Sequence, residues 1–282
     1  MKMIEQLKSL VDQMPDPDAR NMYTTDIDKE KIERAVAAIV RGGRDSVQGL
    51  IDMLGQPGVD EYVKPRYALH CVLNHTLIAK DDQARREFSA LLATNLSGDL
   101  SVDSKAYLCQ ELQWMGREEA VSSLGQLLLD ERLVEAAAMA LVAIKTGAAL
   151  VLRTALANAR GKCRLNIIDA LAALPEHGAV KEMTDALKDD DMEVRIAARA
   201  GLARTPDATT ADSLIQSIGG TSGWERTQTA KSCLVSAESL ADAGKTKEAR
   251  QMYDRIAKSY SGESESHVRE AAASGLMQLQ PS

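Results

Sequence analysis

Apolar residues recur along this chain with the spacing of amphipathic helices, and few segments alternate apolar and polar residues as half-buried strands do. In the segment 194–202, Val194, Ala197 and Gly201 share one helix face at the i, i+3, i+7 spacing. Glycine and proline fall mostly between such segments, where they end helices. The pattern predicts an all-α protein.

The helical pattern also repeats at a nearly fixed period, which is typical of stacked-repeat architectures. Arg164, Arg195 and Arg226 are spaced 31 residues apart, and an apolar residue lies seven positions beyond each of them. A second apolar register advances in step with the first, and it consists of Leu124, Leu152, Met183 and Leu214. Together the two registers predict a unit of about 30 residues, made of one helix, a short turn and a second helix.

One helix pair cannot bury its apolar stripe alone, but a stack of pairs can. We therefore predict a right-handed α-solenoid of stacked antiparallel helix pairs. Turns are expected at 145–149, 175–179 and 205–210, and Pro206 should follow the end of a first helix because proline cannot continue the hydrogen-bond ladder. Small residues such as Gly201 should let neighbouring helices approach closely.

The segments DMEVRIAARAGLARTPD (191–207) and SHVREAAASGLMQL (266–279) resemble the short bacterial HEAT-like repeat of the phycobilisome-lyase type. The resemblance covers about residues 100–220 and 264–280, and it is looser over 28–97. It identifies a fold, because function depends on the sites that a fold carries.

In that family an arginine at the start of the first helix ties adjacent repeats together through carboxylates and main-chain carbonyls. The resemblance therefore implies a structural role for Arg195, with Asp191 as its carboxylate partner. The structural repeat arginines expected on this basis are Arg66, Arg164, Arg195, Arg226 and Arg269.

Two regions depart from the regular unit. Residues 1–26 are expected to form an N-terminal capping helix and linker, because a terminal repeat needs a polar outer face, and residues 27–282 to form the solenoid. Within it, residues 221–262 make a longer unit whose second half, 237–260, resembles a tetratricopeptide helix pair. Trp224 opens this unit. Packing between repeats is its favoured interpretation, and contact with a partner is the alternative.

Composition limits the classes of partner. The chain of 282 residues carries a formal charge of −7, which disfavours nucleic acid and anionic membranes. No apolar stretch approaches the ~20 residues that cross a bilayer, and the N-terminal residues lack the apolar block of a signal peptide. The four cysteines are widely separated, as in proteins of a reducing compartment. We expect a cytoplasmic chain, and a monomer is favoured.

No motif for catalysis is visible. The chain lacks a Gly-x-Ser-x-Gly elbow, a phosphate-binding loop and a dinucleotide fingerprint. His70, Cys71 and His75 lie close together in sequence, but no second pair completes a zinc site, so packing is the favoured interpretation. Glu118 and Glu119 begin a helix, where carboxylates are stabilised by the helix dipole. We expect no enzyme activity, no metal and no cofactor.

The remaining candidate is a surface. Residues two positions before and after the buried positions of the second helices point away from the core, and we expect them to line the concave wall of the solenoid. This second-helix strip comprises Ser122, Gln126, Leu150, Thr154, Lys181, Asp185, Asp212, Gln216, Arg250 and Asp254.

The predicted function is a non-catalytic scaffold that binds a protein or peptide on its concave face, through the second-helix strip and Trp224. The alternative is an accessory or lyase-type subunit that handles a bound prosthetic group. A deep pocket around Cys71–His75 or Trp224 favours the alternative, and a shallow groove favours the scaffold.

Overall fold

The computed structural model describes residues 2–16, 27–55, 63–174 and 179–279. The chain consists of two compact units, Met1–Val151 and Leu152–Ser282, and the division lies inside helix α9 (Ala148–Leu156). The described residues form α-helices and short 3-10 helices, with no strand among them. The prediction of an all-α fold is confirmed. None of the described helices is long and apolar enough to span a bilayer.

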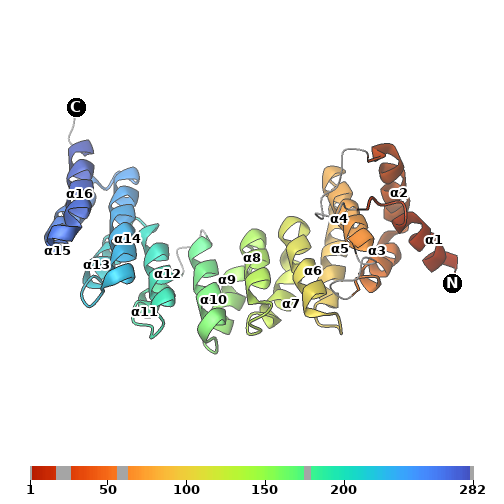
Figure 1. The fold of residues 1–282 in the computed structure, drawn as a ribbon, viewed down its shortest axis with the longest axis horizontal. Coiled ribbons are helices and arrows are strands. Elements are labelled where there is room, and N and C mark those ends of the chain that lie inside the picture. The colour runs from red at the N-terminus through yellow and green to blue at the C-terminus, as the bar shows by residue number, and fades with distance from the viewer. Residues whose placement is uncertain (1, 17–26, 56–62, 175–178, 280–282) are drawn as a thin grey trace. The chain divides into compact units, whose positions relative to one another are not determined.

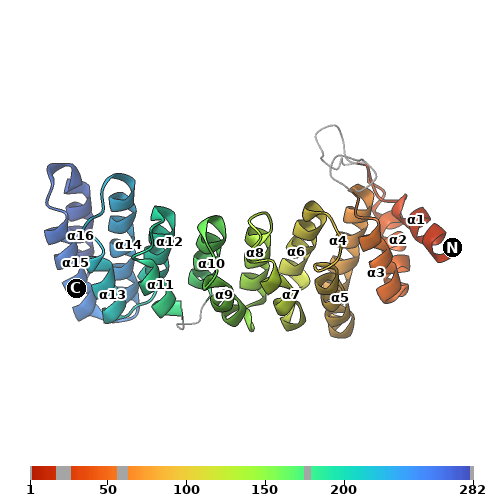
Figure 2. The same ribbon diagram turned by 90° about the horizontal axis from the view of Figure 1, so that it is seen from below.

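Unit 1 begins with α1 and continues as helix pairs (Figure 1). The first helices α2, α4, α6 and α8 pack against one another in order, and the second helices α3, α5 and α7 do the same. Helix α1 packs on α2, α3 and α4 (Figure 2). The bounds are α1 Lys2–Val11, α2 Lys29–Arg41, α3 Gly43–Asp52, α4 Val63–Ile78, α5 Asp82–Asn95, α6 Val102–Met115, η2 Glu118–Ala120, α7 Val121–Gln126 and α8 Val134–Ile144.

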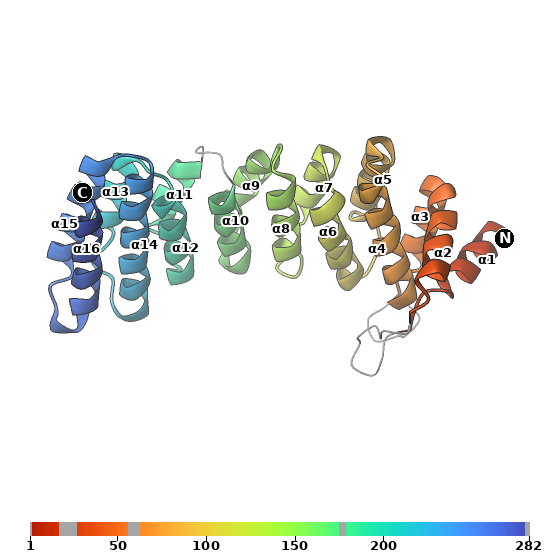
Figure 3. The same cartoon turned by 90° about the horizontal axis from the view of Figure 1, so that it is seen from above.

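Unit 2 is built in the same way. The first helices α10, α12, α14 and α16 pack in order, while α13 packs on both α11 and α15 (Figure 3). The helices α14 and α15 lie within residues 221–262. The bounds are α10 Gly161–Ala173, α11 Val180–Ala186, α12 Met192–Ala203, α13 Ala208–Gln216, α14 Gly223–Asp242, α15 Thr246–Ser259, η4 Glu263–Glu265 and α16 Ser266–Gln278.

The apolar positions of both sequence registers are buried in the core, one register in the first helices and the other in the second helices. Leu171 and Leu202, one repeat apart, are both buried, and so are Leu152 and Met183 in the second helices. Each such side chain contributes roughly 1.5–3 kcal/mol of hydrophobic stabilisation. Equivalent positions therefore have equivalent environments, which confirms the repeated helix pair.

Small residues set the distance between neighbouring first helices. Ala198 is fully buried on α12, and a Cβ added to Gly201 would collide with Met183 Sδ and the side chain of Ala172 on α10. Any larger residue at Gly201 would push the helices apart, because close-packed interiors do not absorb extra atoms.

Helix starts and ends follow the sequence signals. Asp81, Asp191 and Asp207 are N-caps whose carboxylates accept main-chain N–H bonds at the starts of α5, α12 and α13. Pro206 follows the end of α12, as expected. Gly43 has a φ of +57°, a conformation that glycine adopts without strain. The expected turn at 175–179 falls almost entirely outside the described residues.

Candidate binding surfaces

The members of the second-helix strip in unit 2 lie on α11, α13 and α15, and the neighbouring end of α9. Thr154, Lys181, Asp185, Asp212, Gln216 and Asp254 are exposed, whereas Arg250 is half-buried and donates a hydrogen bond to Leu279 O at 3.3 Å. In unit 1, Ser122, Gln126 and Leu150 are exposed as well. Exposure follows directly from the helix period, because these positions lie opposite the buried registers.

Several charges of this strip are already paired. Lys181 Nζ lies 2.6 Å from the Asp185 carboxylate one helical turn away, and Asp212 pairs with Arg255 of α15. Exposed ion pairs of this kind contribute little stability, about 0–1 kcal/mol. The free-energy cost of replacing these ion pairs by other contacts is correspondingly small.

Beside the strip lies a groove of about 450 Å³ in unit 2, formed by α11, α12 and α13 with the start of α14. Gln216 lines it, and its inner wall is formed by Arg195, Arg199 and Glu225. This groove is an open hollow with charged side chains on one wall rather than a closed pocket.

Trp224 is 59% exposed at the first turn of α14. The favoured interpretation of Trp224 as a packing residue is therefore wrong. Its neighbour Glu225 points into the repeat interface, while Trp224 lies about 100° further around the helix and points away. An exposed tryptophan is a typical anchor in protein interfaces.

The repeat arginines link successive first helices. Arg66 pairs with Asp103 on α6, Arg164 with Asp189 before α12, and Arg226 with Glu265 in η4. In each case the carboxylate stands at the start of the next first helix. Arg269, in the final helix, donates instead to the carbonyls of Tyr260 and Gly262, each at 2.7 Å.

Arg195 follows this rule with a partner that differs from the expectation. Its Nε and Nη2 bind both oxygens of Glu225 on α14 at 2.7 and 2.8 Å, and its Nη1 donates to the carbonyls of Asp189 and Asp190. The predicted pairing with Asp191 is wrong, because that carboxylate caps α12 by accepting from Glu193 N–H.

The Arg195–Glu225 pair is part of a larger buried network. Arg199, only 3% exposed, also donates to Glu225, and its Nε donates to Ser217 Oγ at 3.0 Å. The hydrogen bond from Arg195, followed by that from Arg199, lowers the pKa of Glu225 to about 2. Both arginines are satisfied by the protein itself.

His70, Cys71 and His75 all lie on α4. His70 Nδ1 lies 3.1 Å from Glu111, which raises the pKa of His70 through that hydrogen bond. Cys71 and His75 line a groove of about 660 Å³ between α2 and α4, and burial raises the pKa of the Cys71 thiol. The described part of the chain holds no cluster of three metal-ligating side chains.

The sequence interpretation missed a groove between α6 and α8. Trp114 and Met139 are 67% and 52% exposed there, with Gln110 and Gln113 beside them. Trp114 lies two positions beyond the buried Leu112 of α6, so the helix period could have indicated its exposure.

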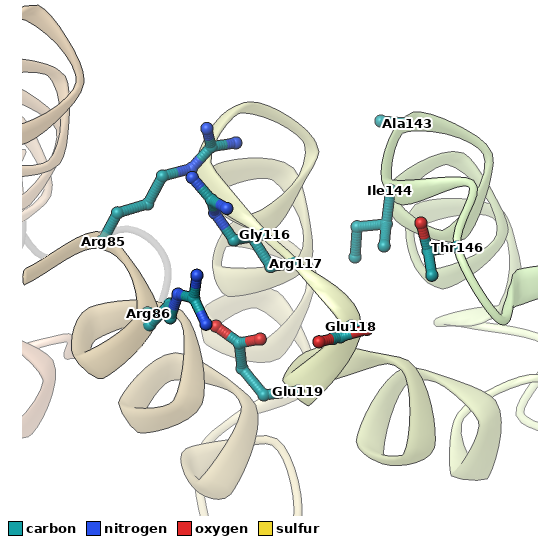
Figure 4. A pocket seen from close by; sticks show the side chains of 9 residues that line it. All are labelled: Arg85, Arg86, Gly116, Arg117, Glu118, Glu119, Ala143, Ile144 and Thr146. Carbon is teal, nitrogen blue, oxygen red and sulfur yellow. The ribbon is translucent and has the colours of Figure 1, made fainter. Parts of the chain in front are cut away.

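A second feature that the sequence did not reveal is a polar pocket of about 410 Å³ in unit 1 (Figure 4). Two arginines come from α5, and a third follows the end of α6 directly after Gly116. The pocket is lined by Arg85, Arg86, Gly116, Arg117, Glu118, Glu119, Ala143, Ile144 and Thr146. None of the three arginines belongs to the repeat register, so no periodicity pointed to them.

Comparison with known proteins identifies the repeats. Residues 149–235 match the family model described as HEAT repeats. A search of curated proteins finds no relative.

Solved structures with a similar arrangement of helices include an engineered protein (17% identity, covering 98% of this chain and 78% of that one, TM-score 0.44). Another is the Escherichia coli protein YibA (14% identity, covering 98% of this chain and 96% of that one, TM-score 0.45). A third is a chain from work on the interaction between cadherin and β-catenin (12% identity, covering 97% of this chain and 60% of that one, TM-score 0.41).

Proposed function

Because the chain is a HEAT-like repeat protein, with the match over residues 149–235, we propose that it is a non-catalytic scaffold that binds a protein or peptide. The second-helix strip is the proposed contact surface, with Trp224 as an additional anchor. Repeat stacks suit this role because they present long surfaces supported by a rigid core.

One observation carries the proposal. The strip exposes polar side chains on three successive second helices of unit 2, and three of its charges are held by the exposed pairs Lys181–Asp185 and Asp212–Arg255. A solvated face has the same composition, so the proposal depends on whether loss of these side chains changes binding while the fold stays intact.

The test is capture of proteins from the extract of the source cell by the full chain and by the variant K181A/D185A/D212A/Q216A. We expect the variant to lose the captured proteins by about tenfold or more, which is about 1.4 kcal/mol. A matched control is K231A/E238A, which removes one positive and one negative exposed side chain from α14. Equal capture by all three proteins contradicts the proposal.

The second candidate, an accessory or lyase-type subunit with a prosthetic group, is supported by the groove at Cys71 and His75. Against it, the raised pKa of Cys71 keeps the thiol protonated at neutral pH, and the thiolate is the nucleophile in covalent attachment. An absorbance spectrum of the chain purified from its own cell tests this candidate, because a bound pigment would colour the protein.

A further inference from the structure

The arginine pocket of unit 1 contains a buried charged donor that lacks an acceptor among the described residues. Arg117 pairs with Asp82 through Nη2, but its Nε is buried without a hydrogen-bond partner. Arg86 makes no hydrogen bond or ion pair with any described residue and points toward Glu119 in Figure 4. Arg86 is exposed, whereas a buried donor without an acceptor such as Arg117 Nε costs free energy, about 1–3 kcal/mol, so native proteins rarely keep one.

The guanidinium groups of Arg85 and Arg117 also face each other. Arg85 donates through Nε to Met115 O at 3.0 Å and through Nη2 to Trp114 O at 3.3 Å, which fixes it at the end of α6. Figure 4 shows the Arg117 guanidinium turned toward that of Arg85. The pKa of Arg85 is lowered by burial and then by the charge of Arg117, so the two like charges are close enough to repel. An anion between them would remove this repulsion.

We propose that the pocket lined by Arg85, Arg86 and Arg117 binds a carboxylate of the protein or peptide partner. The proposal rests on the proposed function. A guanidinium presents parallel N–H donors that match the two oxygens of a carboxylate. A carboxylate in the pocket would offer an acceptor to the Arg117 guanidinium, whose Nε has none among the described residues.

The acidic residues of the pocket select the kind of anion. Glu118 and Glu119 share the lining with the three arginines, and Asp82 already pairs with one of them. The lining holds three arginines and two glutamates, a net charge of +1, which Asp82 on Arg117 reduces to zero. A dianionic phosphate would therefore leave more uncompensated negative charge here than a singly charged carboxylate. Glu119 Oε1 is also buried without a donor, so it can accept the main-chain N–H that stands next to a peptide carboxylate.

The experiment titrates the full chain with small probes and follows the arginine Nε–Hε groups by NMR. N-acetylglycine carries a carboxylate next to an amide N–H and represents a chain terminus, and N-acetylaspartate N-methylamide represents an acidic side chain. We expect saturable shifts of the Arg85 and Arg117 signals, with dissociation constants on the order of 1–10 mM. The tighter of the two probes identifies the source of the carboxylate.

Variants connect the shifts to the pocket. R86Q and R117Q are expected to weaken N-acetylglycine binding about fivefold to tenfold, read from the Arg85 signal. R132Q is the matched control, because Arg132 is exposed, pairs with Asp130 and lies in the α6/α8 groove. Circular dichroism at increasing temperature verifies that each variant is folded.

The proposal is overturned by any of four results: no saturable shift, an equal response to neutral N-acetylglycinamide, tighter binding of methyl phosphate, or equal weakening by R132Q. The probes need no protein partner. A chain that binds N-acetylglycine but captures no protein contradicts the proposed function alone, and the converse result contradicts the pocket alone.

Discussion

The two arginine clusters of this protein have similar composition but different degrees of internal pairing. In unit 2, Arg195 and Arg199 converge on Glu225, and each Nε has an acceptor. In unit 1, Arg85 and Arg117 converge on each other, and Arg117 Nε has no acceptor. In these two clusters, hydrogen bonding within the protein distinguishes the arginines of a structural network from those of a candidate binding pocket.

The largest difference should appear when each cluster loses its carboxylate. E225A leaves Arg199 buried without its ion-pair partner, and we expect unit 2 to lose about 3–5 kcal/mol. D82A removes an exposed partner of Arg117 and should cost unit 1 at most about 1 kcal/mol. Hydrogen exchange of the α12, α14 and α5 amides measures both units separately. Equal losses of stability in the two units would contradict the difference in internal pairing between the two clusters.

The next largest loss of stability is expected at acid pH, where Glu225 of the unit 2 cluster becomes protonated. The folded-state pKa of Glu225, about 2, lies below its ordinary value of 4.5. A lowered carboxylate pKa stabilises the fold above the unfolded pKa, and that stabilisation is lost as pH falls from about 4.5 through 2. We expect unit 2 to lose on the order of 3 kcal/mol over this window, and this contribution should be absent in E225Q. Hydrogen exchange of the α14 amides as a function of pH is the measurement; an identical acid profile for E225Q contradicts the assignment.

A smaller loss of stability is expected from a substitution in the core of unit 2. G201V places side-chain atoms against Met183 and Ala172, and we expect it to destabilise unit 2 by about 1–3 kcal/mol through overpacking. The neighbouring A200V, at a partly buried position, is the control. Denaturant unfolding compares the two variants, and equal stability would show that close helix approach at Gly201 does not matter.

The smallest effects are expected at the candidate binding residues. R86Q and W224A remove side chains that the fold does not use, so each should change stability by no more than about 0.5 kcal/mol. Thermal unfolding measures this directly. A loss above 2 kcal/mol in either variant would assign that residue to the scaffold instead.

The sequence was sufficient for the repeat and its core. Leu171 and Leu202 recur with the period of the helix pair, and periodic burial is a local property that a single sequence carries. The division between Val151 and Leu152 was not predicted, because it falls within a regular helix and has no linker signal.

The partners of the arginines were harder to predict. Asp191 is close to Arg195 in sequence, but Glu225 belongs to the next first helix, and only the stacking of repeats brings it within reach. The pocket of unit 1 depends on the same stacking, since Arg86 and Arg117 are contributed by different helix pairs. Trp224 was misinterpreted because its exposure depends on which side of α14 faces the neighbouring repeat.

The most direct test of the difference between the clusters is one NMR titration of the wild-type chain with N-acetylglycine, in which the Nε–Hε signals of Arg117 and Arg195 are followed together. The account predicts a saturable shift for Arg117, which lines the pocket, and no shift for Arg195, which does not line it and is bonded to Glu225. Equal shifts of the two signals, or a shift of Arg195 alone, would contradict it.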